Sequence, residues 1–272
     1  MKKVAKTQIV DISHHQLSSR INWAQAAKEV DLMIIRVQYG SSLVDREYKK
    51  HVANCKKYGI PFAHYAYARF VSVTDAKIEA KDFLNRIDKG AKFLVLDVEE
   101  LTTSKSEIVA ASQAFIDVCK AAGWKTGLYT GHHFYKPYGM DKVKADFLWI
   151  PRYGVNEGVA QTKPSYSCDI WQYTDKGKVS WYSGHLDLNK LHGSKDLDWF
   201  LGTTEKPTKG VVQVANDKKP VNDVKGHPEE ESIRKAMDKG IIRGYGGEEF
   251  RPNDPVTRAQ LAVILDRLGL LD

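Results

Sequence analysis

Short apolar runs alternate with helix-like segments through about the first 200 residues of the chain. Four segments, 22–30, 45–59, 72–90 and 105–123, carry apolar residues at helical spacing, and the last three end in a glycine suited to a C-cap. This alternation predicts βα units around a parallel sheet. The runs predicted to be strands are 7–13, 32–38, 61–68, 92–99, 125–131, 147–153, 167–174 and 184–191.

After the fifth predicted strand the connections shorten and lose helical periodicity. The predicted fold is therefore an α/β barrel of modified TIM type over residues 1–202, with about five βα units and three less decorated strands. Residues 203–220 are rich in Thr, Lys and Pro and are predicted to be a linker. A small, mainly helical domain follows at 221–272, with helix patterns at 230–240 and from about 254. Its core is thin, so the domain would be only marginally stable alone unless it self-associates or packs on something.

The composition is that of an ordinary globular protein, with 42% hydrophobic and 28% charged residues. The net charge of +7 lies entirely before Glu205, since residues 205–272 hold 12 basic and 12 acidic residues. The excess is spread over helical faces without a dense Lys/Arg run, so no nucleic-acid partner is predicted. It fits either solvated helix faces or attraction to an acidic partner such as a bacterial wall.

The chain lacks the usual patterns of export, membrane insertion and metal chemistry. The start has no apolar core of a signal peptide, and no stretch approaches 18 apolar residues, so neither a signal peptide nor a membrane span is predicted. Cys55, Cys119 and Cys168 are widely spaced among core-like residues, which predicts buried, reduced thiols. The histidine pairs 14–15 and 132–133 are expected to point apart on strands. No zinc, P-loop or Gly-rich nucleotide motif accompanies them, so no metal and no cofactor are predicted.

Candidate chemistry begins where the stretch FLVLDVEE (93–100) runs from apolar residues into acids. Residues two apart share one face of a strand, so Asp97 and Glu99 project together while Glu100 points the other way. The carboxyl ends of parallel barrel strands form the active-site mouth. There, adjacent carboxylates push each other's pKa apart, leaving one protonated acid and one charged partner, as glycoside hydrolysis requires. On this pattern alone, capping or salt-bridging roles are equally open.

Two further acids change that balance. Asp11 (IVDIS) and Asp187 (HLDLN) each break an apolar run near the carboxyl end of a predicted strand. Four acids that converge on one mouth repel each other, which stability does not favour, so the set indicates a functional site.

Aromatic residues toward the strand ends offer flat faces on which sugar rings stack. Aromatic side chains in strands are more often part of a core, so the prediction is that at least three of them line a sugar groove. The candidate substrate-binding residues are Tyr65, Tyr67, Tyr129, Trp149, Tyr153 and Trp171.

A set of ordered motifs over residues 7 to about 200 resembles the glycoside hydrolase family 25 lysozymes, the Chalaropsis-type muramidases common among bacteriophage endolysins. The chain departs from the family at RVQYG (36–40), where a Thr-Glu pair often precedes the glycine. The motifs are DISHHQ (11–16), DVE (97–99), LYTG (128–131), LWIPRY (148–153), IWQYT (170–174) and DLN (187–189).

The resemblance implies cleavage of the β-1,4 bond between N-acetylmuramic acid and N-acetylglucosamine. It makes Glu99 the general acid, Asp97 the partner carboxylate, and Asp11 and Asp187 supporting acids. An acid two residues after a carboxylate is similar to the substrate-assisted arrangement, in which Asp97 orients the N-acetyl group of the substrate. An inverting route, with water activated by Asp187 or Asp11, stays open.

The C-terminal segments NDVKGH (222–227), KGIIRGY (239–245) and FRPNDPVTRAQ (250–260) resemble one S-layer homology repeat. Thr257 and Gln260 fit a capping box, and Arg258 at that helix start suits an anion. The resemblance implies binding of secondary cell-wall polysaccharide, whose carboxylate suits Arg258. Members usually carry three repeats, so either three chains form a homotrimer through this domain or one repeat binds weakly.

The two resemblances together imply a phage endolysin that is made in the cytoplasm of a Gram-positive host and acts on the cell wall after release. Its predicted substrate is the peptidoglycan glycan strand, without nucleic-acid or membrane partners. A chitinase-like glycosidase is one alternative, which cleavage of soluble chitin oligomers tests. A catalytically inactive wall-binding lectin is another, although a lectin has no need of protonatable carboxylates. A bacterial autolysin exported by another route also fits.

Overall fold

The computed structural model describes residues 8–202, 222–239, 241–242, 250–256, 261, 264–265, 268 and 270. The chain divides into two compact units, Met1–Glu205 and Lys206–Asp272. The predicted linker 203–220 lies outside the described residues, so its bounds stay a prediction. None of the described helices is long and apolar enough to cross a membrane.

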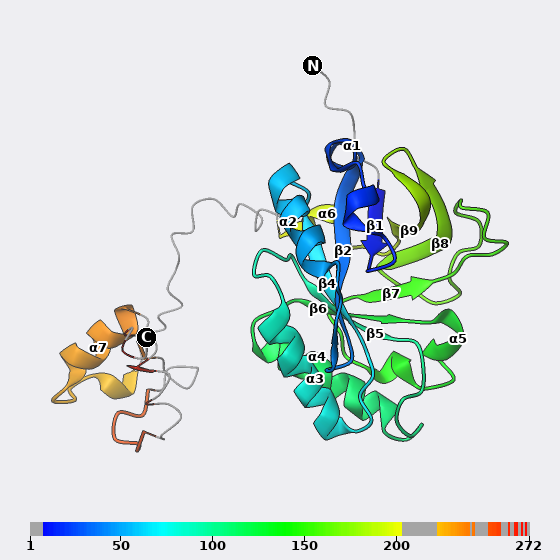
Figure 1. Cartoon of the computed structure of the whole chain (residues 1–272). Coiled ribbons are helices and arrows are strands. Elements are labelled where there is room, and N and C mark those ends of the chain that lie inside the picture. The colour runs from blue at the N-terminus through cyan, green and yellow to red at the C-terminus, as the bar shows by residue number, and fades with distance from the viewer. Residues whose placement is uncertain are drawn as a thin grey trace. The chain divides into compact units, whose positions relative to one another are not determined.

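Eight strands of the first unit close into a barrel (Figure 1). Their order is β1-β9-β8-β7-β6-β5-β4-β2, and pairing of β1 with β2 completes the ring. The short β3 (Leu43–Val44) pairs with the end of β2 in the antiparallel direction. All eight predicted strands are present, so the predicted fold class is confirmed. The barrel strands are β1 (Gln8–Ile12), β2 (Val30–Tyr39), β4 (Phe62–Tyr67), β5 (Leu94–Val98), β6 (Thr126–Thr130), β7 (Leu148–Pro151), β8 (Ile170–Val179) and β9 (Tyr182–Leu191).

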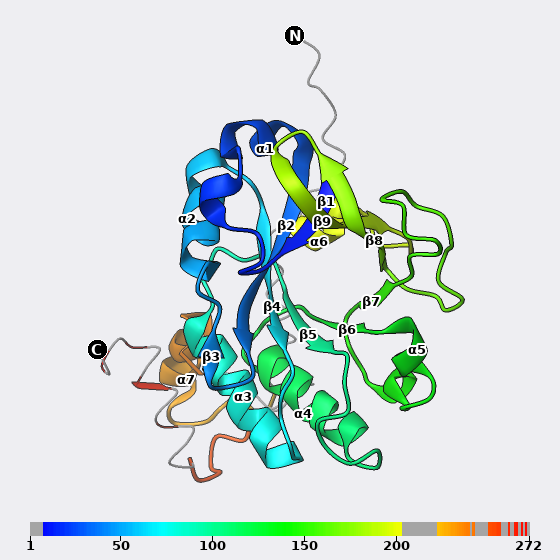
Figure 2. The same ribbon diagram turned by 45° about the vertical axis from the view of Figure 1, so that its right-hand side comes forward.

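Five βα units precede the less decorated strands β7, β8 and β9, as predicted, and the larger helices cover the outside of the sheet (Figures 1 and 2). Gly59 caps its helix in the left-handed conformation. The predicted cap at Gly90 is wrong: α3 ends at Arg86, because Ile87 turns into the core and Asp88 closes its own turn by accepting the Gly90 N–H. The helices are α1 (Trp23–Glu29), α2 (Tyr48–Tyr58), α3 (Val73–Arg86), α4 (Ile108–Ala121), α5 (His132–Tyr135) and α6 (Leu197–Leu201).

Strand β9 runs antiparallel to both of its neighbours, so the sheet is not wholly parallel. It forms a hairpin with β8, and its middle residue Asp187 lies opposite Asp11 of β1. The prediction that Asp187 lies near the carboxyl end of its strand is therefore wrong. The antiparallel register brings this mid-strand position to the carboxyl end of β1.

Alternate residues of each strand point into the barrel. The inward positions form one apolar cluster that includes Leu32, Val95 and Trp149, and Phe200 of α6 packs in the same cluster. Gly127 is required there, since a Cβ at this position would lie 2.2 Å from the Phe147 ring. The outward positions pack against the helices in a larger cluster. The inner cluster fills the barrel beneath the carboxyl ends of the strands, where the polar positions begin.

In the second unit, a 3-10 turn (Asn222–Val224) leads to α7 (Glu230–Asp238), which matches the predicted helix pattern at 230–240. The Asp223 carboxylate accepts the backbone N–H groups of Phe250 at 2.9 Å and Arg251 at 2.6 Å. Arg258 and most of the second predicted helix lie outside the described residues.

Candidate active site

A recess of about 330 Å³ opens at the carboxyl ends of the parallel strands. It holds all four predicted catalytic acids and five of the six predicted aromatic residues. The sequence motifs, which lie between residues 11 and 189, therefore contribute residues to one place. The lining residues are Asp11, Ser13, His15, Arg36, Tyr65, Tyr67, Asp97, Glu99, Tyr129, Trp149, Tyr153, Gln172, Asp175 and Asp187.

Strand register brings these side chains together. Asp97 of β5 pairs with Tyr67 of β4 on one side and with Tyr129 of β6 on the other. Asp11 of β1 pairs with Asp187 of β9. Because side chains of paired residues lie on the same face of the sheet, each acid is flanked by a neighbour that also points into the recess.

Asp11 and Asp187 form a hydrogen-bonded carboxyl pair with unequal roles. Burial raises the pKa of Asp11, but amide hydrogen bonds from Asn189 and Gln172 and a hydrogen bond with Asp187 oppose this rise. Burial, followed by the charge of Asp11, raises the pKa of Asp187 to about 9. Asp187 is therefore the protonated partner near neutral pH, and Asp11 is the charged one.

Two amide side chains donate hydrogen bonds to the Asp11 carboxylate. The Nε2 of Gln172 donates to its two oxygens at 3.0 and 3.2 Å, and the Nδ2 of Asn189 donates at 2.8 Å. Tyr129 and Tyr153 donate their hydroxyls to the Oε1 of Gln172 at 2.8 and 2.5 Å. These two tyrosines thus fix the orientation of the amide as well as lining the recess, a role that sequence reasoning missed.

Replacing Gln172 with Ala is expected to lower both stability and activity. The Asp11 carboxylate would lose its bonds from the Gln172 amide, and a buried acceptor left short of donors costs about 1–3 kcal/mol. Displacement of the acid pair should lower kcat/KM by about 10- to 100-fold. Thermal unfolding and initial hydrolysis rates measure the two effects. Gln161→Ala in an exposed loop is the control, and equal effects of the two variants would contradict the assigned role.

Asp97 is buried, and its Oδ1 accepts no hydrogen bond from the described residues. Burial raises its pKa well above the ordinary value, the negative charges of Glu99 and Asp11 raise it further, and the nearby Arg36 guanidinium opposes them. Arg36 is held by an Nε bond of 2.9 Å to Asp45, which fixes one positive charge beneath the acid cluster. A buried acceptor of this kind is suited to an N–H group of a bound substrate.

Glu99 follows the last residue of β5 and lies at the opening of the recess. Much of its surface is accessible, but that surface faces the recess, whose walls restrict hydration of the carboxylate. Desolvation by these walls, followed by the charge of Asp11, raises the pKa of Glu99 to about 7. Glu100 does not line the recess and pairs with Arg69 at 2.5 Å. Asp97 and Glu99 therefore share a direction that Glu100 does not.

The structure does not bring Trp171 to the recess. Its indole N–H donates to the backbone carbonyl of Arg152 at 2.7 Å, and its ring packs with Ile150 and Cys168. The physical reason is the strand period of two: Gln172 of the same strand points inward, so Trp171 points outward. The prediction that Trp171 lines the sugar groove is wrong for this recess.

Of the cysteines and paired histidines considered from the sequence, only His15 lines the recess. The three cysteines are buried and free, as predicted. His14 and His15 lie in a turn after β1 rather than on a strand, and their ring centroids are only 4.0 Å apart, contrary to expectation. Over the part of the chain that the structure describes, no group of three or more His, Cys, Asp or Glu residues is placed to hold a metal ion.

Comparisons with known proteins agree with this geometry. The catalytic domain of an endolysin from bacteriophage P40 of Listeria monocytogenes is 34% identical with a TM-score of 0.68, over 73% of this chain and 98% of that domain. The glycosyl hydrolase 25 virulence factor GHIP of Streptococcus pneumoniae is 28% identical with a TM-score of 0.66, over 71% of this chain and 90% of its own. The lysozyme of Streptococcus phage Cp-1 is 34% identical over 161 residues, which are 52% of this chain and 46% of that lysozyme.

The family models cover both units of the chain. The model for the S-layer homology domain matches residues 222–262, and the model for glycosyl hydrolases family 25 matches residues 10–181. Both resemblances drawn from the sequence are thereby confirmed. The chain belongs to glycosyl hydrolases family 25, as a glycoside hydrolase of the lysozyme type with a C-terminal S-layer homology domain.

Proposed function

We propose that this peptidoglycan hydrolase is an N-acetylmuramidase, which cuts the β-1,4 bond between N-acetylmuramic acid and N-acetylglucosamine. One observation carries the proposal: Glu99, with a pKa of about 7, lies beside the buried Asp97 in a recess walled by aromatic rings. A protonated carboxyl, a partner carboxyl and flat faces are what hydrolysis of a glycosidic bond requires.

In the first step, Glu99 donates its proton to the glycosidic oxygen as the bond to the sugar carbon breaks. The carbonyl oxygen of the substrate's N-acetyl group attacks the same carbon from the opposite side and forms a cyclic oxazolinium intermediate. Asp97 accepts the N–H of that group through its Oδ1, which accepts no hydrogen bond from the described residues. In the second step, the Glu99 carboxylate takes a proton from water, which opens the ring with net retention.

The alternative inverting route requires Asp187 or Asp11 to deprotonate a water molecule. The pKa of Asp187 is raised to about 9, so near pH 7 it already carries a proton and is a poor base. Asp11 is charged, but Gln172 and Asn189 already donate to its two oxygens, so neither oxygen is left without a hydrogen bond. Both observations support the substrate-assisted route, with Asp11 and Asp187 as a support that sets the local charge.

Product analysis tests this proposal. Purified Gram-positive peptidoglycan is digested, the new reducing ends are reduced with borohydride and identified by mass spectrometry, and the first-formed anomer is observed by NMR. We expect muramic acid ends and the β anomer. Glucosamine ends would contradict the assigned bond, and the α anomer would contradict substrate assistance. Soluble chitin oligomers serve as the comparison, and their efficient cleavage would favour the chitinase-like alternative.

The pH dependence of kcat/KM follows from Glu99. Its pKa is raised to about 7, so the proton needed for catalysis is present below that pH and is lost above it. We therefore expect kcat/KM to fall about tenfold per pH unit above the raised pKa, as the fraction of protonated acid does. Initial rates on a soluble glycan in buffers of constant ionic strength measure this limb. A rate that stays level up to about pH 9 would show that Glu99 is not the acid.

The enzyme is proposed to act as a phage endolysin, made in the host cytoplasm and acting on the wall after release. Its likeness to the endolysin of bacteriophage P40 and to the lysozyme of phage Cp-1 supports this role. Production inside a Gram-positive host should leave cells intact until the membrane is permeabilised from outside. Lysis without permeabilisation would favour an exported autolysin instead.

The S-layer homology domain is proposed to bind secondary cell-wall polysaccharide, with Arg258 as the contact to its carboxylate. Within α7, which is described throughout, no side chain is fully buried, so this helix keeps accessible surface that another copy of the chain could cover. This supports assembly of three chains through the domain, and light scattering tests it against the chain mass of 30.7 kDa. A monomer at micromolar concentration would exclude the trimer and leave a single, weakly binding repeat.

A further inference from the structure

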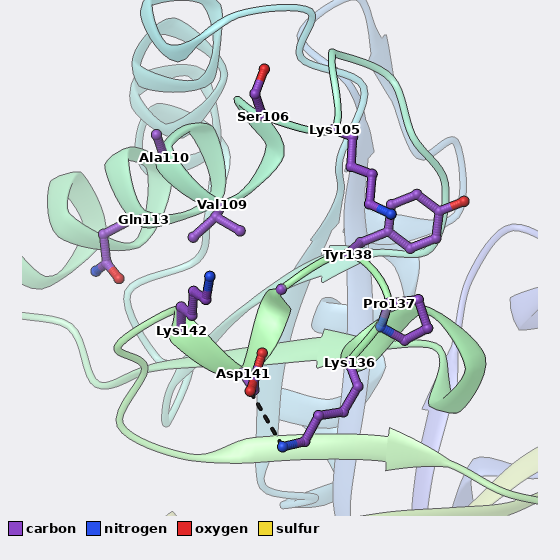
Figure 3. Close-up of a pocket in the computed structure, with 11 residues that line it drawn as sticks. Lys105, Ser106, Val109, Ala110, Gln113, Lys136, Pro137, Tyr138, Asp141 and Lys142 are labelled. Carbon is purple, nitrogen blue, oxygen red and sulfur yellow. Dashed lines mark ion pairs between the residues drawn. The ribbon is translucent and has the colours of Figure 1, made fainter.

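A second hollow lies outside the barrel, between the start of α4 and the turn that follows α5 (Figure 3). Its volume is about 810 Å³, larger than that of the catalytic recess. Lys105, Lys136 and Lys142 line it together with Tyr138, Val109 and Asp141. We call it the lysine groove. None of these six residues takes part in the mechanism above.

The charge of the lysine groove is opposite to that of the catalytic recess. Its single lining carboxylate, Asp141, is paired with Lys136 at 3.4 Å. Lys105 and Lys142 are exposed, and neither has a carboxylate partner among the described residues. Two uncompensated ammonium groups therefore face one hollow, whereas five carboxyl groups line the recess. Such a surface attracts anions and disfavours cations.

The walls of the lysine groove are held in shape by packing and by a tight turn. Phe134 stacks on the Tyr138 ring at a centroid distance of 3.9 Å, and the Nζ of Lys105 lies 5.3 Å from the centre of that ring. Gly139 has a φ of +71°, a conformation that favours glycine, and its N–H bonds to the Lys136 carbonyl at 3.0 Å. Figure 3 shows the amine of Lys105 beside the ring. Phe134 thus covers one face of the half-buried Tyr138 ring, and the ring borders the charges of the groove.

The lysine groove also lies at the edge of the barrel that carries the active site. Lys105 follows β5 by way of the loop that begins with Glu99, and residues 136–142 follow β6. Parallel neighbouring strands end at the same edge, so both lining segments leave the sheet beside the catalytic mouth. The lysine groove and the mouth of the recess therefore lie at the same edge of the barrel.

We propose that the lysine groove binds an anionic wall polysaccharide attached to peptidoglycan, a polymer that carries phosphodiester or carboxylate groups along a sugar or polyol chain. Lysine ammonium groups bind such anions as point charges. The half-buried Tyr138 ring adds apolar surface beside these charges, against which a sugar or polyol chain can pack. This inference rests on the proposed function, because it assumes that the recess holds a peptidoglycan strand. It adds a wall contact on the barrel that is independent of the S-layer homology domain.

Titration of the full chain with soluble polymers tests the lysine groove separately from catalysis. The probes are glycerol-phosphate wall polymer, polygalacturonate and a soluble stem peptide, each followed by calorimetry at low and high salt. The variant is Lys105→Glu with Lys142→Glu. Its matched control is Lys77→Glu with Lys81→Glu, which makes the same charge change on two exposed lysines of α3.

We expect the Lys105/Lys142 variant to bind at least one of the two polysaccharides about tenfold more weakly, with a difference that shrinks at high salt because screening weakens ion pairing. The control variant should stay within about twofold of the wild type. Loss with the phosphate polymer alone, or with polygalacturonate alone, identifies the anion. Equal loss in both variants, no loss in either, or loss confined to the stem peptide would overturn the proposal.

Hydrolysis of peptidoglycan stripped of its attached polymers separates this inference from the proposed function. Both double variants should hydrolyse stripped peptidoglycan at the wild-type rate, because the four lysines lie outside the recess. If the wild type releases no muramic acid ends, the proposed function fails whatever the titrations give. A slower rate for the Lys105/Lys142 variant on stripped material would mean that the groove acts on the glycan itself, and would overturn the proposal.

Discussion

Glu99→Gln should reduce kcat by about 100- to 10,000-fold while leaving the fold intact, since this is the range that a positioned general acid contributes. Glutamine keeps the shape of the side chain but has no proton to donate to the leaving oxygen. Release of new reducing ends from purified peptidoglycan, followed by mass spectrometry, measures the loss. Wall binding by the variant should persist, because the aromatic walls and the C-terminal domain are unchanged.

The neighbouring residue supplies the control. Glu100→Gln makes the same substitution one position along the chain, but Glu100 faces Arg69 and does not line the recess. Its kcat should stay within about threefold of the wild type, because an exposed ion pair contributes little and the Oε1 of glutamine can still accept the Tyr67 hydroxyl, which Glu100 accepts at 2.9 Å. Equal losses in both variants would indicate damage to the end of β5 rather than removal of an acid.

Glu99→Gln also changes the pH dependence of stability, and the sign of the change follows from the raised pKa of Glu99. Folding raises the pKa of Glu99 from an ordinary 4.5 to about 7, so the folded state binds its proton more tightly than the unfolded chain. The stability contributed by this proton is complete below about pH 4.5 and is lost as the pH rises through about 7. Glutamine removes this dependence, so Glu99→Gln should be no less stable than the wild type at pH 8.

The acids of the site could be predicted from the sequence because the two-residue period of a strand shows which of its side chains share a face. In FLVLDVEE the apolar run identifies the strand, and the period of two places Asp97 and Glu99 on one face. The same reasoning applied to Asp11, whose strand is short and parallel to its neighbour β2. These residues needed only local pattern and the rule that active sites lie at the carboxyl ends of barrel strands.

The rest of the site depends on contacts between distant segments, which local pattern does not contain. Gln172 gave no signal, although it links Tyr129 and Tyr153 to Asp11, because an amide is significant only when its partners are known. The direction of β9 was also missed, since an apolar run reads the same in either orientation. Trp171 was misassigned because the sequence does not say which face of β8 points inward.

The Asp11 and Asp187 pair shows how a repulsive arrangement is tolerated. Two ionised carboxyl groups side by side in a buried site would be strongly unfavourable, so one keeps its proton and donates to the other. The pair then presents one negative charge that amide hydrogen bonds stabilise. Desolvation is the largest cause of the raised pKa of Glu99, and this single fixed charge is the next, so the supporting acids help to keep the proposed general acid protonated.

Asp97→Asn provides the strongest test of substrate assistance. Asparagine cannot ionise, so it cannot supply the negative charge with which an ionised Asp97 would stabilise the N–H group as the oxazolinium forms. The kcat should therefore fall about 100-fold or more, with a smaller change in KM. The variant should be at least as stable as the wild type, because burial already disfavours the charged form of Asp97. Thermal unfolding and single-substrate kinetics measure both.

The decisive comparison uses peptidoglycan whose N-acetyl groups have been removed, because Asp97 is assigned to no other group of the substrate. Deacetylation should slow the wild type severely but slow Asp97→Asn little further, since residue and acetamido group act as one unit and their losses are not additive. Asp187→Asn should lose activity yet keep the full penalty for deacetylation, because its bond is to Asp11 rather than to the sugar. Additive losses in Asp97→Asn would mean that Asp97 acts on water or on the ring and not through the N-acetyl group.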